Sequence, residues 1–297
     1  TLFLGYNKGL VDWANRALTH PNITVDTLHG LIGKAMYWAG YEADMTKMSR
    51  GEFDDSLTEW LIKVTQRLRD NPALLNKHGY DALVVDEGQD FEADQWAHIV
   101  KFLRRPVEDV LYVFADDGQR IFGDVRDTLI KLGEPFYLDE NCRTTQQIHA
   151  YAQRYTHNPT KCDDNPVGNP VQIHPAPTTD VAYQTERDLL HWLIYEQGIP
   201  AHEIVLLTPI SPKKTTLWGN ETQLGTITVA RRITDQHDPQ RTVLVSTIHA
   251  YKGLECGVAI LCELTSAHPD NRNALMYVAL TRARHAVYVI GDLPAPM

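Results

Sequence analysis

The sequence has few cysteines and no long apolar run. Its four cysteines include no C-x-x-C pair, so neither a zinc site nor a disulfide framework is indicated. No apolar run approaches the roughly 20 residues of a membrane-spanning helix, and the first residues lack the basic region and cleavage site of a signal peptide. We therefore expect a soluble protein in a reducing, cytoplasmic setting, with no membrane partner.

Positive charge is also scarce. The chain has 28 Lys and Arg against 38 Asp and Glu, a formal net charge of −10, which argues against a general nucleic-acid coat protein. Residues 41–100 hold 13 acidic and 6 basic side chains, a balance of −7, so the other 237 residues carry only −3. The acidity therefore says little about a groove elsewhere.

Short apolar runs of strand length alternate with longer stretches of helical periodicity, the pattern of βαβ units and a parallel sheet. The chain has no internal repeat, and its 43% hydrophobic and 22% charged residues are those of an ordinary globular protein. A helix is expected over residues 185–196, before Gly198 and Pro200. The expected strands are residues 1–4, 82–85, 110–114, 204–207, 243–245, 258–261 and 286–290. The predicted class is doubly wound α/β, and 297 residues allow two domains.

Polar residues gather where these runs end, which is where open α/β sheets place their chemistry. Asp86 and Glu87 follow one strand, and such a pair is costly to desolvate unless it binds a cation such as Mg²⁺. An isolated D-E pair can equally end a strand as a solvated acidic turn. Gln119 follows the next run and is of the kind that orients a water or senses a terminal phosphate. Further polar segments follow at residues 138–144, 247–255 and 277–283, and five in this order favour a functional interpretation.

On these segments the chain resembles the UvrD/Rep-type superfamily 1 DNA helicases. Residues 2–10 are similar to the family's motif Ia, T-L-H at residues 27–29 to motif Ib, and D-E-G-Q-D at residues 86–90 to its Walker B motif. Residues 116–122 resemble motif III, and residues 138–144 resemble motif IV. The most specific matches are T-I-H-A-Y-K-G-L-E at residues 247–255, for motif V, and Y-V-A-L-T-R-A at residues 277–283, for motif VI.

The resemblance implies a motor of two RecA-like (P-loop NTPase) lobes, with ATP in the cleft between them and single-stranded DNA across their top surface. It implies that Asp86 holds Mg²⁺ and that Glu87 activates the attacking water. Gln119 would contact the γ-phosphate or that water and relay its state to the DNA site.

The second lobe would complete the nucleotide site. By the same resemblance, Arg143 and Arg282 would be arginine fingers, an element worth on the order of 10³–10⁵ in rate. Glu255 would bind the ribose, with Lys252 and Gly253 shaping the preceding turn.

Helix geometry favours Arg282 over Arg284 as the second finger. Leu275, Val278 and Arg282 fall at i, i+3 and i+7 on one helical face, whereas Arg284 points elsewhere. An arginine on an apolar face is costly unless it meets an anion, and a structural ion pair is the alternative to a catalytic role.

The nucleic-acid contacts of the family map onto Tyr6, Asn7, Thr27, His29, Phe122, Thr247 and His249. The two T-x-H turns suit hydrogen bonding to two phosphates along one strand. Phe122 stands at an aromatic position that stacks on bases, and Tyr6 would be a second platform. Core packing is the alternative for both aromatics. Asp124 replaces the Trp that the family often has, so the stacking pocket is altered.

The family's P-loop, G-x-x-x-x-G-K-[ST], is absent from the sequence. The near match at residues 33–35, G-K-A, lacks the earlier glycine and the Mg²⁺-binding hydroxyl, so we interpret it as a helix start. The chain also begins with Thr inside a strand-like run. We therefore expect the P-loop strand and helix to precede Thr1, and we expect this chain alone to bind ATP poorly and not to hydrolyse it.

Motif spacing predicts a compact core. His29 and Asp86 are 57 residues apart, and Arg143 and Thr247 are 104 apart, where large family members carry accessory domains. We expect a partial first lobe over residues 1–139, with a small helical insert at about residues 34–78, and a second lobe over residues 140–297.

Two functions remain open. One is the motor core of an ATP-dependent 3′–5′ DNA helicase or translocase that uses ATP and Mg²⁺, acts on single-stranded or single-strand-tailed DNA, and has a possible nuclease, repair or defence partner. The other is a pseudo-helicase module that binds nucleic acid or protein without turnover. Retention of a complete hydrolysis set favours the motor.

Overall fold

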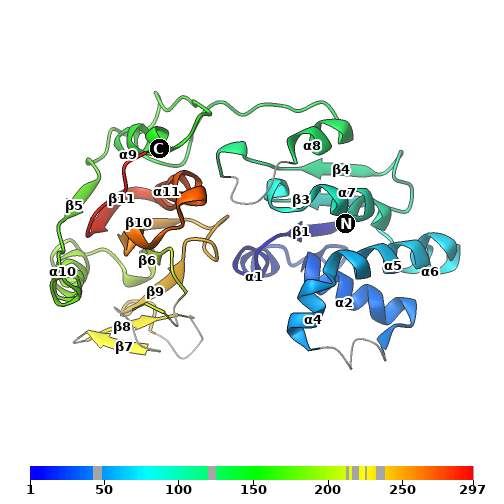
Figure 1. Cartoon of the computed structure of the whole chain (residues 1–297), viewed down its shortest axis with the longest axis horizontal. Coiled ribbons are helices and arrows are strands. Elements are labelled where there is room, and N and C mark those ends of the chain that lie inside the picture. Colours follow the sequence, from blue (N-terminus) through cyan, green and yellow to red (C-terminus); the bar gives the residue numbers. More distant parts are fainter. Residues whose placement is uncertain are drawn as a thin grey trace. The chain divides into compact units, whose positions relative to one another are not determined.

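The computed structural model describes residues 1–42, 49–119, 125–211, 214–215, 221–224, 226–231 and 238–296. The chain divides into two compact units, Thr1–Phe136 and Tyr137–Met297 (Figure 1). Each unit has its own sheet and its own hydrophobic core.

The first unit is built on a four-stranded parallel sheet in the order β2-β1-β3-β4. Its strands are β1 (Leu2–Gly5), β2 (Thr24–Thr27), β3 (Ala82–Val85) and β4 (Val110–Val113). Its helices include α1 (Lys8–Ala17), α2 (Leu28–Ala39), α4 (Arg50–Asp55), α5 (Leu57–Asp70), α6 (Pro72–His78), α7 (Ala93–Ile99) and α8 (Arg126–Leu132). Short 3₁₀ turns are η1 (Gly88–Asp90), η2 (Val100–Phe102) and η3 (Asp117–Gln119).

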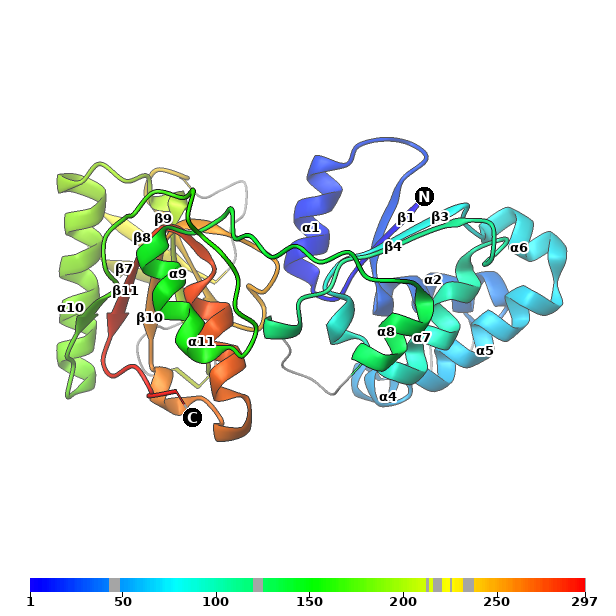
Figure 2. The same ribbon diagram turned by 90° about the horizontal axis from the view of Figure 1, so that it is seen from above.

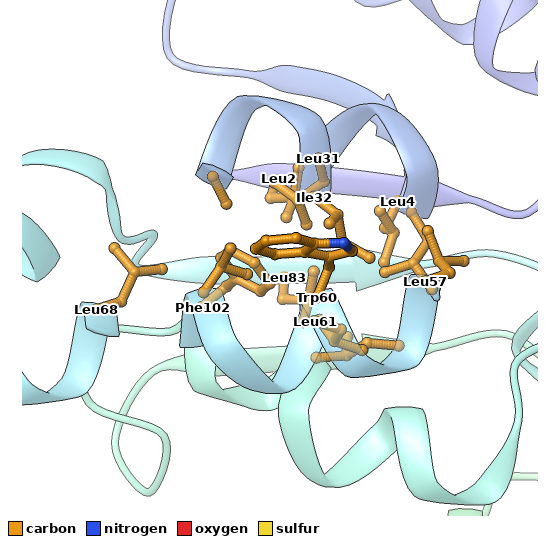
Figure 3. Close-up of a cluster of buried hydrophobic side chains, with 14 of the residues drawn as sticks. Leu2, Leu4, Leu31, Ile32, Leu57, Trp60, Leu61, Leu68, Leu83 and Phe102 are labelled. Atoms are coloured by element: carbon orange, nitrogen blue, oxygen red, sulfur yellow. The ribbon is translucent and has the colours of Figure 1, made fainter. Parts of the chain in front are cut away.

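One face of this sheet carries the core of the unit. Leu2 and Leu83 face each other in register and are buried under α2, α5 and α7. Figure 3 shows the Trp60 indole of α5 among leucines of the sheet and of α2. Helices α2 and α5, which fall in or overlap the region expected as a helical insert at residues 34–78, contribute side chains to this core.

The opposite face is, within the described residues, covered by a helix only over β1 and β2. The strand register places Val25, Phe3, Val84 and Tyr112 in one row across the sheet. Helix α1 packs over Val25 and Phe3, and Figure 2 shows it on the other side of the sheet from α2 and α5. Exposure rises along the row from 7% at Val25 to 62% at Tyr112. Strand β4 thus presents a bare apolar surface at the edge of the sheet, which also includes Val110 and Phe114.

The second unit contains a seven-stranded sheet in the order β5-β11-β10-β6-β9-β8-β7, in which only the β7–β8 pair is antiparallel. Its strands are β5 (Gln172–His174), β6 (Ile204–Thr208), β7 (Glu221–Leu224), β8 (Ile227–Ala230), β9 (Thr242–Thr247), β10 (Cys256–Cys262) and β11 (Ala283–Ile290). Its helices include α9 (Gln146–Ala152), α10 (Thr179–His191) and α11 (Arg272–Leu280), with short turns η4 (Gln153–Tyr155), η5 (Trp192–Glu196), η6 (Ala201–Glu203), η7 (Leu264–Ser266) and η8 (Pro269–Asn271). Strands β6 and β10 are buried throughout, as expected for the centre of a parallel sheet.

The predicted class, α/β with RecA-like parallel sheets, is confirmed, and each of the seven expected strands is present. Four strands were not expected: β2, β5, β7 and β8. The helix expected at residues 185–196 begins earlier, because the Thr178 hydroxyl caps it by accepting a hydrogen bond from the backbone N–H of Val181. It continues as the π-helical turn η5 and stops before Gly198, whose φ is +69°. None of the helices in the described ranges has the length and apolar character to span a membrane.

Candidate functional site

The two acidic residues predicted to bind metal and water follow β3 directly. The backbone N–H of Asp86 donates to the carbonyl of Leu4 (3.0 Å), and the Asp86 Oδ1 accepts from the backbone N–H of Glu87 (2.9 Å). Glu87 has a φ of +55°, a left-handed conformation that costs on the order of 1 kcal/mol or more for a side chain larger than glycine. The strand end therefore turns sharply and holds the two carboxylates in a fixed local geometry.

Gln89 connects these carboxylates to motif III. Its Nε2 donates to Glu87 Oε2 (2.6 Å), and its Oε1 accepts from the backbone N–H of Asp116 (3.0 Å). Asp116 Oδ2 in turn accepts from Gln119 Nε2 (2.6 Å). Glu87, Gln89 and Gln119 are all buried. One chain of hydrogen bonds thus joins the predicted catalytic carboxylate to the predicted γ-phosphate sensor.

This arrangement fits a metal site that water and substrate complete better than a site made of protein ligands alone. The described residues contain no group of three or more His, Cys, Asp or Glu side chains placed to hold a metal ion. Mg²⁺ commonly takes one or two carboxylates and completes its shell with water and substrate phosphate. The Asp86 and Glu87 pair supplies donors of that kind.

The two T-x-H turns have the same local structure. Thr27 ends β2 and its Oγ1 accepts from the backbone N–H of Gly30 (3.1 Å), while Thr247 ends β9 and its Oγ1 accepts from the N–H of Ala250 (3.0 Å). In both turns the middle residue is buried and the histidine is exposed. Each hydroxyl accepts a bond within its own turn and keeps its proton as a donor.

The G-K-A stretch at residues 33–35 lies inside α2, and the interpretation of it as a helix start is wrong, because α2 begins at Leu28 under the Thr27 cap. Its lysine, Lys34, pairs through Nζ with Asp26 Oδ2 (2.8 Å). The N–H groups of a helix interior are engaged in the helix itself, so this stretch cannot cradle a phosphate. Its rejection as a P-loop is correct.

Two of the predicted nucleic-acid residues of the first unit line one cavity. Tyr6 and His29 face a space of about 310 Å³ whose walls also carry Asp54, Asp55, Asp90 and Glu92. Burial raises the pKa of Tyr6, and the carboxylates of Asp90 and Glu92 raise it further. His29 Nε2 lies 3.5 Å from Asp54 Oδ1. This cavity is acidic, which the motif pattern does not predict.

The remaining predicted residues of this group have different positions. Asn7 is the N-cap of α1, where its Oδ1 accepts from the backbone N–H of Leu10 (2.8 Å). The edge of the Tyr6 ring meets Phe91, with centroids 5.6 Å apart. Phe122 lies outside the described residues.

In the second unit, motif V forms a tight turn after β9. Gly253 has a φ of +80°, a backbone conformation that favours glycine, and Lys252 beside it is buried. Desolvation lowers the pKa of His249, and the nearby charge of Lys252 lowers it further. His249 is therefore poised to act as a neutral hydrogen-bonding group near pH 7.

Motifs IV, V and VI meet in an ion-pair chain. Arg143 Nε donates to Glu255 Oε2 (3.1 Å), and Arg284 Nη1 lies 3.8 Å from Glu255 Oε1. The Nη2 of Arg284 donates to Glu203 Oε2 (2.8 Å). The predicted finger Arg143 and the predicted ribose ligand Glu255 are thus direct partners.

The helical-face argument for Arg282 is wrong. Helix α11 ends at Leu280, so Arg282 lies in the turn before β11 and not on the helix. It is 1% exposed, and its guanidinium donates to the carbonyls of Val278 (3.0 Å) and Leu254 (3.1 Å). Arg284, which the same argument placed on the surface away from the site, is the half-exposed arginine beside Glu255.

Sequence reasoning missed four residues of these networks: Gln89, Asp116, Arg284 and Glu263. Glu263 follows β10 with a φ of +56° and accepts from the hydroxyls of Thr208 (3.0 Å) and Thr215 (2.8 Å). Glu87 and Glu263 are the non-glycine residues with positive φ in the described ranges. The D-E-x-Q-D spacing could have indicated Gln89, whereas no sequence signal marks Glu263.

The UvrD-like helicase C-terminal domain family matches residues 242–290, which include both segments with the most specific motifs. A comparison with curated protein sequences finds no significant match. The fold is similar to the C-terminal domain of a possible DNA helicase from Lactobacillus plantarum, with 15% identity, a TM-score of 0.39, and coverage of 52% of this chain and 89% of that one.

Two viral helicases also resemble the chain. The Arterivirus nonstructural protein 10 helicase has 13% identity and a TM-score of 0.43, over 98% of this chain and 53% of its own. The PRRSV helicase has 18% identity and a TM-score of 0.38, over 72% of this chain and 37% of its own. The chain thus spans about half or less of these two proteins.

Proposed function

We propose that this chain, whose residues 242–290 match the UvrD-like helicase C-terminal domain family, is the motor core of an ATP-dependent 3′–5′ DNA helicase or translocase. The family match over residues 242–290 is the observation that carries this proposal, since it spans the turn of Thr247 and His249 and the turn of Arg282. The substrate would be single-stranded DNA or DNA with a single-stranded tail, and a nuclease or a repair or defence protein would be its partner.

The described residues support the hydrolysis half of this function. Mg²⁺ would be held by Asp86 and would neutralise phosphate charge. Glu87, fixed by Gln89, would accept a proton from the attacking water, and Gln119 at the end of the same hydrogen-bond chain would sense the phosphate. Such positioning is the main protein contribution to phosphoryl transfer.

The second unit would supply the arginine side chains that contact the phosphates. Arg143 is half-exposed and donates one hydrogen bond to Glu255. Binding of a ribose by Glu255 would therefore free the guanidinium of Arg143. Arg282 is buried among carbonyls and would need to leave them to reach a phosphate. Of the two predicted fingers, Arg143 has the smaller rearrangement to make.

A strand and helix carrying the P-loop would complete the first unit. Parallel sheets are normally covered on both faces, yet Tyr112, Val110 and Phe114 on the outer face of β4 are exposed within the part of the chain that the structure describes. Among the described strands β4 is the edge of its sheet, so one more strand could pair with it, and a helix after that strand would cover the three apolar side chains. We therefore infer that this chain is one part of the motor and that it has no ATPase activity alone.

The test measures ATP hydrolysis and oligonucleotide binding on the same preparation. We expect fluorescence anisotropy to show binding of single-stranded DNA that weakens in the double variant T247A/H249A, and we expect no DNA-stimulated release of phosphate. Hydrolysis by this chain that disappears in Glu87→Gln would refute the incomplete-motor proposal. Absence of any DNA binding at low salt would refute the motor function.

A non-hydrolysing binding module is the second candidate, favoured by the missing P-loop. The intact hydrogen-bond chain from Glu87 to Gln119 opposes it, because binding alone does not require these buried polar contacts. The two candidates separate when a segment with G-x-x-x-x-G-K-[ST] is joined ahead of Thr1. Gain of ATPase activity supports the motor, and its continued absence supports the module.

A further inference from the structure

The first unit presents one of its predicted phosphate contacts in an unfavourable setting. His29 stands in the first turn of α2, whose N-terminus is capped by the Thr27 side chain through the N–H of Gly30. A helix N-terminus with an imidazole beside it suits an anion. The side chains around His29 are acidic, however, and therefore disfavour an anion.

Helix α4 lies directly against His29. Asp54 Oδ1 is 3.5 Å from His29 Nε2, and the Phe53 ring meets the His29 ring with centroids 6.3 Å apart. The helix is held in shape by a capping box in which Ser49 and Glu52 exchange hydrogen bonds. A preformed helix therefore places a carboxylate on the imidazole that a phosphate would use.

The rest of the cavity adds to this effect. Asp55 of the same helix, together with Asp90 and Glu92 beside η1 and α7, lines the walls around Tyr6 and His29. Two like charges about 4 Å apart repel even in water, and the repulsion lowers affinity roughly fivefold for each such pair at low salt. A phosphodiester entering here would meet several carboxylates.

The equivalent turn of the second unit is built differently. His249 has Lys252 as its charged neighbour, and no carboxylate pairs with it among the described residues. The two T-x-H turns therefore share a backbone but differ in charge. The charge next to the histidine is a lysine in the second unit and the carboxylate of Asp54 in the first.

We propose that helix α4 is an electrostatic gate over the first unit's nucleic-acid site, with Asp54 occupying His29 until a DNA strand displaces it. This inference rests on the proposed DNA-binding function. Helix α4 would then regulate the affinity for DNA. The DNA strand binds first to the turn of Thr247 and His249, and it contacts the His29 turn only after α4 is displaced.

The test compares Asp54→Asn with wild type in anisotropy titrations of a fluorescein-labelled oligothymidylate at two ionic strengths. We expect Asp54→Asn to bind about fivefold more tightly at low salt, and we expect the gain to shrink at high salt because the charges are screened. The matched control is Asp70→Asn, which makes the same charge change at the exposed last residue of α5, where the carboxylate accepts from Gln66. We expect this control to match wild type.

A double variant identifies the site of action. In His29→Ala the Asp54→Asn change should give a smaller gain than in the wild-type background, since the imidazole that it releases is gone and only the direct repulsion of the phosphate is relieved. Equal affinities of Asp54→Asn and wild type, an equal gain in Asp70→Asn, or an undiminished gain in His29→Ala would overturn the gate. If wild type and every variant fail to bind even at low salt, the DNA-binding function itself fails. The two failures are therefore distinguishable.

Discussion

Replacing Gln89 by alanine should destabilise the first unit, because this one side chain links two buried partners. Its amide donates to the carboxylate of Glu87 and accepts from the backbone N–H of Asp116. It is 1% exposed, so water cannot replace both contacts in a well-packed interior. Since Glu87 is also buried, its carboxylate would lose a charge-assisted hydrogen bond.

The magnitude follows from the two bonds. A hydrogen bond to a charged group contributes about 1.5–3 kcal/mol, and a buried backbone donor left without an acceptor costs about 1–3 kcal/mol. Some water entry into the space left by the side chain offsets part of this loss. We expect Gln89→Ala to reduce the free energy of unfolding by roughly 2–4 kcal/mol, which lowers a urea midpoint by about 1–2 M for a unit of this size.

The assay is equilibrium urea unfolding followed by tryptophan fluorescence, to which the first unit contributes four of the six tryptophans. Trp96 is fully buried and packs close to Gly88 in the same turn. Gln89→Met fills the space without hydrogen bonds and should lose most of the same stability. Gln66→Ala, at an exposed glutamine of α5 that bonds only Asp70, should change it by less than about 0.5 kcal/mol. If Gln89→Ala and Gln89→Met behave like Gln66→Ala, the proposed linkage is wrong.

Three glycine positions and one histidine give further predictions. Gly30→Ala should lower the melting temperature by several degrees, because its Cβ would come within 2.0 Å of Asp26 Oδ1, whereas Gly51→Ala has open space and should leave it unchanged or higher. Gly253→Ala should destabilise the second unit by about 1 kcal/mol in urea unfolding, since alanine is strained at its φ of +80°. The lowered pKa of His249 means that the folded state resists protonation, so its contribution to stability is present above pH 6.5, the ordinary value, and is lost as the pH falls below it. Melting temperatures from about pH 7.5 to about pH 5 should therefore fall less steeply in His249→Gln than in wild type.

Strands with continuous apolar runs could be predicted from the sequence, because burial on both faces leaves an unambiguous signal. The runs at residues 82–85 and 204–207 coincide with β3 and β6 almost residue for residue. Strand β2 has the sequence T-V-D-T and gives no such run. It is an edge strand, and its aspartate forms an ion pair with a lysine of the following helix. Short edge strands of this kind depend on pairing with a neighbour, which local sequence does not reveal.

The candidate site likewise has residues that could be predicted from the sequence and residues that could not. Motif spacing located the positions of Glu87 and Gln119, but the side chain that joins them could be identified only when the fold brought η1 next to residue 116. The helical-face argument for Arg282 failed because α11 ends at Leu280, two residues before Arg282. Arg284 meets Glu203 and Glu255 across the sheet, a contact between segments far apart in the chain that periodicity cannot show.

The bare outer surface of β4 also bears on how the chain behaves in a test tube. An edge strand with an exposed apolar row, as β4 is among the described residues, is a template onto which a second chain can add its own strand. At high concentration the isolated protein would then self-associate through β4, and its apparent molecular mass would rise with concentration. The substitution Tyr112→Lys would put a charge on this exposed face and keep the protein monomeric.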